Sequence, residues 1–363
     1  MKTFTVTIHH SCNYGAILQT YALQQAVLEN GVDNEVMEYP YNEKYYGKVS
    51  FKNPIYDLKI VYSNIQKIIH RKKIRKREDS FALFRANLLK LSRMYSSMDD
   101  LRKDPPKVDA LITGSDQVWR FVANEEFVEA RFLDFGPENI KRISYAPSIE
   151  RLNYTDSQKE YVKNILKGYA SISVREQSAA DYLKSFAGLE VSRVLDPVFL
   201  LEKKDWLKIV TERKIKGPYI LCYQVQSAPL MQKLVNKIKK LTGYRTVAVL
   251  PYSTKWINTD ETLYDVSPEE FLYLIEGAEI VISASFHGAA LGIEFDKVVY
   301  ATARNTYNER IKGIMNLVGA GDFFVENESE IPHPNAYDKK KVLAKLCEER
   351  EYSKLYLKKS LFN

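Results

Sequence analysis

The sequence contains little cysteine and no long apolar segment. Its three cysteines, Cys12, Cys222 and Cys347, are far apart and odd in number. Because they lack the paired spacing of zinc ligands and cannot form a complete disulfide framework, we expect reduced thiols and no metal site. No stretch reaches the roughly 18 apolar residues of a membrane span, and the first residues lead into a strand pattern rather than a signal peptide. We therefore expect a cytoplasmic protein.

The chain also lacks internal repeats and low-complexity segments. Its apolar fraction of 45% and charged fraction of 27% are close to those of globular domains, which argues against disorder and coiled coil. A chain of 363 residues exceeds the size at which one hydrophobic core usually stops growing, so we expect two domains. The net charge of +7 is compatible with anionic substrates, membrane surfaces or nucleic acid, and it does not choose between them.

Residues 1–205 show the alternation of strands and helices that is typical of a Rossmann-like lobe. A strand pattern at 3–8 leads through a polar loop into a helix pattern that stops at Asn30-Gly31, and a second short strand follows at 36–39. Further short apolar runs, each followed by a loop with Gly, Ser, Asp or Pro, predict strands at 110–113, 143–146, 171–174 and 191–195.

A second series of patterns predicts another Rossmann-like lobe over 206–335. The expected strands are 219–225, 246–250, 279–283 and 298–300. Ser267-Pro268-Glu269-Glu270 has the cap, the first-turn proline and the third-position glutamate of a helix start, and Gly277 should end that helix. Residues 336–363 are expected to be a helical segment, and its return to the N-terminal lobe is a hypothesis.

Candidate ligand-binding residues follow the first of these strands. Open parallel sheets bind ligands beyond the carboxyl ends of their strands. Asn13, Tyr14 and Gly15 lead from the first strand into a helix whose N-terminal amides suit an anion. Asn13 has a plain alternative as a helix cap, and Gly15 has one in backbone geometry alone.

A second polar turn follows the strand at 110–113. Ser115, Asp116 and Gln117 are suited to hydrogen-bond the hydroxyls of a sugar, and Trp119 to stack on its ring. Simple helix capping explains Ser115 equally well.

An arginine and a histidine follow two later strands. The planar fork of Arg175 matches phosphate and carboxylate, although a salt bridge to the neighbouring Glu176 is the more ordinary role. His287, one of only five histidines, follows the strand at 279–283, where an imidazole can give or take a proton near neutral pH. A lone histidine is nevertheless more often structural.

Five motifs together resemble the polysaccharide pyruvyl transferase family, over roughly residues 4–317. They are, in order, Asn13-Tyr14-Gly15 through Leu18-Gln19, Gly114 to Trp119, Ser173 to Glu176, Asp196-Pro197-Val198 and Ser285-Phe286-His287-Gly288. The resemblance implies two lobes similar to the GT-B glycosyltransferases, with the active site in the cleft between them. It also implies phosphoenolpyruvate as donor, a cyclic pyruvate ketal on two hydroxyls of a sugar, release of phosphate, and no other cofactor. The products would be capsule, exopolysaccharide or cell-wall polymers.

The resemblance also assigns roles to residues. His287 matches the family histidine proposed as acid or base, and Arg175 matches the arginine thought to bind the donor through charge-assisted contacts. The resemblance places the motif neighbours of His287, which are Ser285, Phe286 and Gly288, on the donor side. It places the motifs at 13–15 and 115–119 on the acceptor side or in the cleft.

One departure from the family pattern concerns the donor site. Some members carry a second arginine at the position of Ser285, so another cation must contact the donor here. The candidates are Arg304, Arg310 and Lys255, of which Arg310 is preferred.

A basic segment follows the partly apolar stretch 56–62. Its cations are Lys67, Arg71, Lys72, Lys73, Arg75, Lys76 and Arg77. A basic amphipathic helix suits anionic lipid at the inner face of the cell membrane, where a lipid-linked oligosaccharide acceptor would lie. A solvated helix face is the alternative. Because no familiar reader motif accompanies the segment, we expect no nucleic-acid partner.

Two other functions stay open at this point. A glycosyltransferase of the same shape would use a nucleotide sugar and need a pocket for the base and ribose, which nothing in the sequence indicates. A non-catalytic relative that binds a glycan is raised mainly by Ser285.

Overall fold

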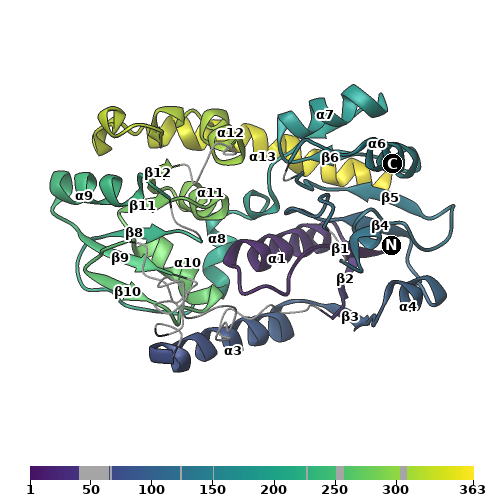
Figure 1. Cartoon of the computed structure of the whole chain (residues 1–363), viewed down its shortest axis with the longest axis horizontal. Coiled ribbons are helices and arrows are strands. Elements are labelled where there is room, and N and C mark those ends of the chain that lie inside the picture. The colour runs from purple at the N-terminus through teal and green to yellow at the C-terminus, as the bar shows by residue number, and fades with distance from the viewer. Residues whose placement is uncertain are drawn as a thin grey trace, which may run out of the picture.

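Two parallel sheets lying side by side, one in each half of the chain, form the framework of the molecule (Figure 1). The computed structural model describes residues 1–40, 65, 68–122, 125–149, 151–225, 228–250, 257–302 and 309–363. None of the helices in these ranges combines the length and the apolar character that crossing a bilayer requires.

The N-terminal sheet has five parallel strands in the order β3-β2-β1-β4-β5. Their bounds are β1 Lys2–Val6, β2 Asp33–Glu38, β3 Leu91–Met94, β4 Ala110–Thr113 and β5 Lys141–Ser144. Strand β4, which lies between β1 and β5, is buried along its whole length, which explains its uninterrupted apolar run. The predicted strands at 171–174 and 191–195 form a separate short pair, β6 (Ser173–Val174) and β7 (Ser192–Arg193), joined to β5 by a bridge between Ile143 and Ser171.

The C-terminal sheet has six parallel strands in the order β10-β9-β8-β11-β12-β13. Their bounds are β8 Tyr219–Tyr223, β9 Arg245–Val249, β10 Glu261–Leu263, β11 Ile280–Ser283, β12 Val298–Thr302 and β13 Phe324–Val325. Counted from β8, this is the 3-2-1-4-5-6 order of the Rossmann fold, and the N-terminal sheet has the same order up to its fifth strand. Both lobes are therefore Rossmann-like, as predicted.

Helices cover both sheets. Those of the N-terminal lobe are α1 Tyr14–Glu29, α3 Arg71–Leu88, α4 Met98–Lys103, α5 Val128–Arg131, α6 Asp156–Leu166 and α7 Gln177–Ala187. After α8 (Lys203–Trp206) follow α9 Met231–Thr242, α10 Pro268–Gly277, α11 Phe286–Glu294, α12 Glu309–Leu317 and α13 Lys339–Phe362. The predicted start and end of α10 are confirmed: Ser267 Oγ accepts from the Glu270 amide, and the Glu270 carboxylate accepts from the Ser267 amide.

Helix α1 lies between the two lobes (Figure 1). Thirteen of its sixteen residues are buried, so it has no solvent face and shows no amphipathic pattern. Tyr14, at its start, donates its hydroxyl to the carbonyl of Val266 in the C-terminal lobe and stacks on Phe271. The first helix of one lobe is thus part of the core that joins both.

Helices α3 and α13 run along opposite sides of the molecule and touch both lobes (Figure 1). Within α13, Arg350 pairs with Glu294 of α11, and Ser353 accepts from the amide of Leu195 in the N-terminal lobe. Within α3, Arg85 donates to the carbonyl of His10, and Lys76 approaches Asp265 of the C-terminal lobe. These contacts fix the relative position of the loops that face each other between the sheets.

Candidate active site

The strand order brings the predicted site residues to one region. The loops after β1 and β4 lie beside each other, because these strands are neighbours at the point where the strand order of the N-terminal sheet reverses. Helix α11 follows β11, the corresponding strand of the other sheet. Ligands of doubly wound sheets bind at such switch points.

The side chain at the centre of this region is Asp196. Its Oδ2 accepts from Nη1 of Arg175 at 2.6 Å and from Oγ of Ser115 at 3.0 Å, and lies 3.3 Å from Nε2 of His287. Its Oδ1 accepts from the amide of Val198 at 3.1 Å. One buried carboxylate therefore connects the arginine of the N-terminal lobe with the histidine of the C-terminal lobe.

The electrostatics of this cluster favour the ionised forms of its acid and its arginine. Burial acts to raise the pKa of Asp196, but the charges and hydrogen bonds of His287 and Arg175 outweigh it and hold the pKa well below its ordinary value. Burial likewise opposes the charge of Arg175, but Glu176, Asp196 and Asp116 outweigh it and raise its pKa. The cluster thus holds permanent charges in a place from which water is largely excluded.

One guanidinium nitrogen of Arg175 has no hydrogen-bond partner among the described residues. Its Nε donates to Oε1 of Glu176 at 2.8 Å and its Nη1 to Asp196, while among the described residues nothing accepts from its buried Nη2. The guanidinium carbon lies 4.3 Å from the centre of the Phe286 ring. Arg175 therefore forms salt bridges that fix its guanidinium group, and its Nη2 can still donate to a ligand.

His287 is the second residue of α11, and its ring packs directly on Gly15 of α1. A Cβ atom at position 15 would overlap the imidazole at Nδ1. Glycine is required here by the close approach of the two helices. Asn13 caps α1 by accepting from the Gly15 amide at 2.9 Å, so the cap and the glycine together position the surface on which His287 lies.

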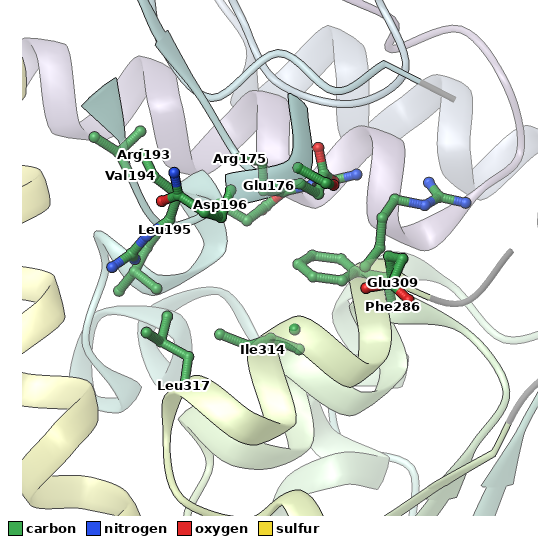
Figure 2. Close-up of a pocket in the computed structure, with 14 residues that line it drawn as sticks. Arg175, Glu176, Arg193, Val194, Leu195, Asp196, Phe286, Glu309, Ile314 and Leu317 are labelled. Carbon is green, nitrogen blue, oxygen red and sulfur yellow. Dashed lines mark hydrogen bonds and ion pairs between the residues drawn. The ribbon is translucent and has the colours of Figure 1, made fainter. Parts of the chain in front are cut away.

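A cavity of about 160 Å³ adjoins the cluster and is lined by both lobes. Figure 2 shows Arg175, Asp196 and Phe286 along one side of it, and Ile314 and Leu317 of α12 along the other. Arg310 of α12 also lines it. The cavity therefore combines an apolar wall with three arginines and three carboxylates, Glu176, Asp196 and Glu309, of which Glu176 and Asp196 are paired with Arg175.

Arg310 and Gln117 meet across the two lobes. With the Gln117 amide oriented so that its oxygen faces Arg310, that oxygen accepts from both terminal nitrogens, at 2.8 and 3.0 Å. The preceding Asp116 has a left-handed backbone with φ of 73°. The other two proposed cations, Arg304 and Lys255, lie outside the described residues.

The structure corrects three of the sequence-based roles. Trp119 is completely buried, stacks on Phe132 and donates to the carbonyl of Arg131, so it offers no ring face to a sugar. Tyr14 is 1% exposed and joins the lobes. Ser115 caps no described helix: it is fully buried, and its hydroxyl lies within hydrogen-bond distance of the Ala146 carbonyl and of Asp196.

The remaining donor-side residues lie around the start of α11. Ser285 is half-buried and precedes the helix without capping it through its side chain. Gly288 is required by packing, since a Cβ there would overlap Ser283 and Tyr223. Asp196 was predicted only as part of a motif, although it follows β7 just as the other candidates follow their strands.

Comparison with known families decides where this chain belongs. The family model for polysaccharide pyruvyl transferase matches residues 13–306, which include Arg175, Asp196, His287 and nearly all of both lobes. The chain belongs to the polysaccharide pyruvyl transferase family. Membership identifies it as a pyruvyl transferase of polysaccharide synthesis. No curated protein sequence matches it.

Solved structures similar to this pyruvyl transferase confirm its GT-B-like fold. A protein assigned as a UDP-N-acetylglucosamine 2-epimerase from Listeria monocytogenes has a TM-score of 0.50 at 9% identity, covering 98% of this chain and 89% of the other. UDP-GlcNAc 2-epimerase from Methanocaldococcus jannaschii has a TM-score of 0.50 at 11% identity, covering 95% and 92%. At these identities the similarity concerns the fold alone.

Proposed function

We propose that this chain transfers a pyruvyl group from phosphoenolpyruvate to two hydroxyls of a sugar in a polysaccharide precursor, forming a cyclic ketal and releasing phosphate. The observation that supports it best is the Arg175–Asp196–His287 cluster beside a cavity that both lobes line. It offers a spare guanidinium donor for an anion and an imidazole held by a carboxylate. These groups match the requirements of the reaction.

The reaction moves three protons and breaks one bond to phosphate. A proton adds to the methylene carbon of phosphoenolpyruvate, which becomes the methyl group, and positive character develops at the neighbouring carbon. One sugar hydroxyl bonds to that carbon and loses its proton, and the carbon–oxygen bond to phosphate breaks. The second hydroxyl then bonds to the same carbon, loses its proton and closes the ketal ring. Of the two protons that the hydroxyls lose, one balances the proton gained by the methylene carbon and the other leaves on the released phosphate.

Each group of the cluster has a part in these steps. The free Nη2 of Arg175 donates to the phosphate or carboxylate of the donor, and Phe286 keeps the guanidinium plane in place. Asp196 lies 3.3 Å from Nε2 of His287 and orients the imidazole, which exchanges protons with the substrates. Asp196 itself stays ionised and acts as a positioning residue.

Arg310 supplies the cation that the family pattern places at Ser285. It lines the same cavity as Arg175 and is held at its tip by Gln117. The Arg310→Ala variant is expected to weaken phosphoenolpyruvate binding about 10- to 100-fold, because a hydrogen bond to a charged group contributes about 1.5–3 kcal/mol. Calorimetric titration measures this. Lys312→Ala, two residues along α12 and paired with Glu326 at the surface, is the control. Equal affinity in both variants would exclude Arg310 from the donor site.

The packing of Gly15 against His287 gives a further prediction. Gly15→Ala pushes the imidazole out of position, and a misplacement of about 1 Å can cost about 100-fold in rate. Turnover should therefore fall by about that factor while the far-UV circular dichroism stays unchanged. Gly168→Ala, where a Cβ meets only an ordinary contact with the Ile165 carbonyl, should leave the rate unaltered. A fully active Gly15→Ala enzyme would contradict the proposed place of His287.

The activity is tested by incubation with phosphoenolpyruvate and aryl hexosides that have free 4- and 6-hydroxyls. The proposal predicts phosphate and a pyruvate ketal in equal amounts, identified by mass spectrometry. The matching 6-deoxy hexosides, which lack one of these two hydroxyls, should give no 4,6-ketal. Glycosyl transfer from a nucleotide sugar to the same acceptors, without any ketal, would instead support the glycosyltransferase alternative.

We also propose that helix α3 contacts anionic lipid, which would place a lipid-linked acceptor near the enzyme. Its exposed cations are Arg71, Lys72, Lys73, Arg75 and Lys76, whereas Lys67 and the stretch 56–62 lie outside the described residues. Arg77 is excluded from this face, because it is 1% exposed and directed at the carbonyl of Tyr264.

The lipid contact is measured by cosedimentation with phosphatidylcholine vesicles with and without phosphatidylglycerol. Reversing the charge of Lys72 and Lys73 to Glu should weaken binding to anionic vesicles roughly thirtyfold or more, since each cation near such a surface contributes about 1 kcal/mol. The same reversal at the exposed Lys358 and Lys359 of α13 is the control. Binding that is equal in both variants, or absent in the unaltered chain, would reject the proposal.

A further inference from the structure

We propose that His9, His10 and Glu38 form a binding site for a divalent transition-metal ion such as Zn²⁺. The histidines follow β1 and the glutamate is the last residue of β2, and these two strands are parallel neighbours. One ligand atom from each side chain lies within 4.8 Å of the others. The sheet thus brings together residues that are far apart in the sequence. No local ligand spacing in the sequence therefore indicates this site.

The environment of His9 is that of a metal ligand. Its Nε2 lies 2.8 Å from the carbonyl of Met37, to which it donates, and this leaves the lone pair on Nδ1. His9 is fully buried, and no described residue bonds to its Nδ1. A ligating histidine typically donates its other ring N–H to a carbonyl in this way. A buried hydrogen-bond acceptor without a partner destabilises the folded protein, and an ion bound to Nδ1 would remove this destabilisation.

His10 and Glu38 complete the ligand set. Nε2 of His10 lies 3.5 Å from Oε1 of Glu38, and the His10 ring is 3.9 Å from the His9 ring and 4.8 Å from the Tyr39 ring. The Glu38 side chain is 16% exposed, so its carboxylate gives an ion access from solvent. Two histidines and a glutamate are a common zinc ligand set, and three protein ligands leave a coordination position open.

Arg85 of α3 lies close to the cluster. Its guanidinium donates to the carbonyl of His10 at 3.3 Å, so its positive charge opposes an added cation, and the carboxylate of Glu38 offsets that charge.

A bound ion would stabilise the loop that leads to the active site. The ion would connect the segment after β1 to the end of β2. His9, in that segment, is four residues before Asn13. Asn13 caps the helix on which His287 rests. The proposal concerns ion binding alone and does not depend on the pyruvyl-transfer chemistry.

The test is calorimetric titration of Zn²⁺ into the untagged, chelator-treated full chain with Cys347→Ser as background, which removes the exposed thiol. One ion per chain is expected. Glu38→Gln and His10→Gln should each weaken binding by more than about 100-fold, the upper end of the loss from removing only an outer-shell partner. His333→Gln removes an exposed histidine elsewhere and should bind as the background does.

A second measurement avoids variants that fail to fold. Addition of Co²⁺ to the same background chain should give the visible absorption of a four- or five-coordinate ion with nitrogen and oxygen ligands and no thiolate band, and excess Zn²⁺ should remove it. No saturable uptake of either ion, or Zn²⁺ binding that Glu38→Gln and His10→Gln both retain, would overturn the proposal. The two rings would then be core residues packed on Tyr39.

Discussion

The His287→Gln variant is expected to lose turnover about 10²- to 10⁴-fold while phosphoenolpyruvate affinity stays nearly unchanged. The donor's anionic groups are assigned to Arg175 and Arg310, whereas the imidazole exchanges protons only as bonds form and break. Glutamine preserves a polar side chain of similar size at the start of α11, so the packing on Gly15 should survive. Phosphate release with the diol acceptors measures turnover, and calorimetry measures affinity.

The control for this variant is His333→Gln, which removes an exposed histidine whose ring only accepts from the Asn335 amide. It should retain the full rate. If His287→Gln kept most of its activity, the imidazole would be a structural part of the lobe junction. If it lost donor affinity as well as turnover, His287 would have to contact the donor in its ground state.

The second large effect concerns Asp196 and the stability of the junction. Asp196→Ala leaves the buried Arg175 without its closest partner. Breaking a buried ion pair by removing one member typically costs about 3–5 kcal/mol, so the free energy of unfolding should fall by about that amount. Denaturant titration monitored by circular dichroism measures the change. Asp156→Ala, at a fully exposed carboxylate at the start of α6, should alter stability far less.

The loss in Asp196→Ala should also depend on pH. The ordinary pKa of the carboxyl is 3.8, and in the folded protein it lies well below that value. Its stabilising contribution is therefore fully present above about pH 4 and declines as pH falls through the folded-state pKa. The difference in unfolding free energy between wild type and variant should be constant near neutral pH and shrink in acid. A difference that grew in acid would contradict the ionised, paired state of Asp196.

The strands that sequence predicted are those whose burial leaves a clear apolar run. Strands β4 and β11 are buried at every position and their bounds are nearly those expected. The strands β3, β10 and β13 were missed, because they lie at the sheet edges, are short, and two of them are only partly buried. Edge positions need no continuous apolar sequence, so periodicity gives no signal there.

The site was predicted in its location and only partly in its residues. Strand ends indicated where Arg175 and His287 lie, since the carboxyl edge of a parallel sheet can be found from the strands alone. The direction of Trp119 could not be found this way, because the left-handed backbone at Asp116 turns the chain so that the indole enters the core. The need for glycine at position 15 comes from an imidazole in the other lobe, which no local pattern contains.

We propose that this cavity binds phosphoenolpyruvate through Arg175. The most direct measurement is calorimetric titration of phosphoenolpyruvate into wild type, Arg175→Ala and Arg175→Lys, with UDP-N-acetylglucosamine titrated in parallel. We predict saturable donor binding to wild type, its loss in Arg175→Ala, and weak binding to Arg175→Lys, which retains the charge without the planar fork. Circular dichroism establishes that the variants are folded. Binding of the nucleotide sugar with no response to phosphoenolpyruvate, or donor binding that folded Arg175→Ala retains, would contradict the account.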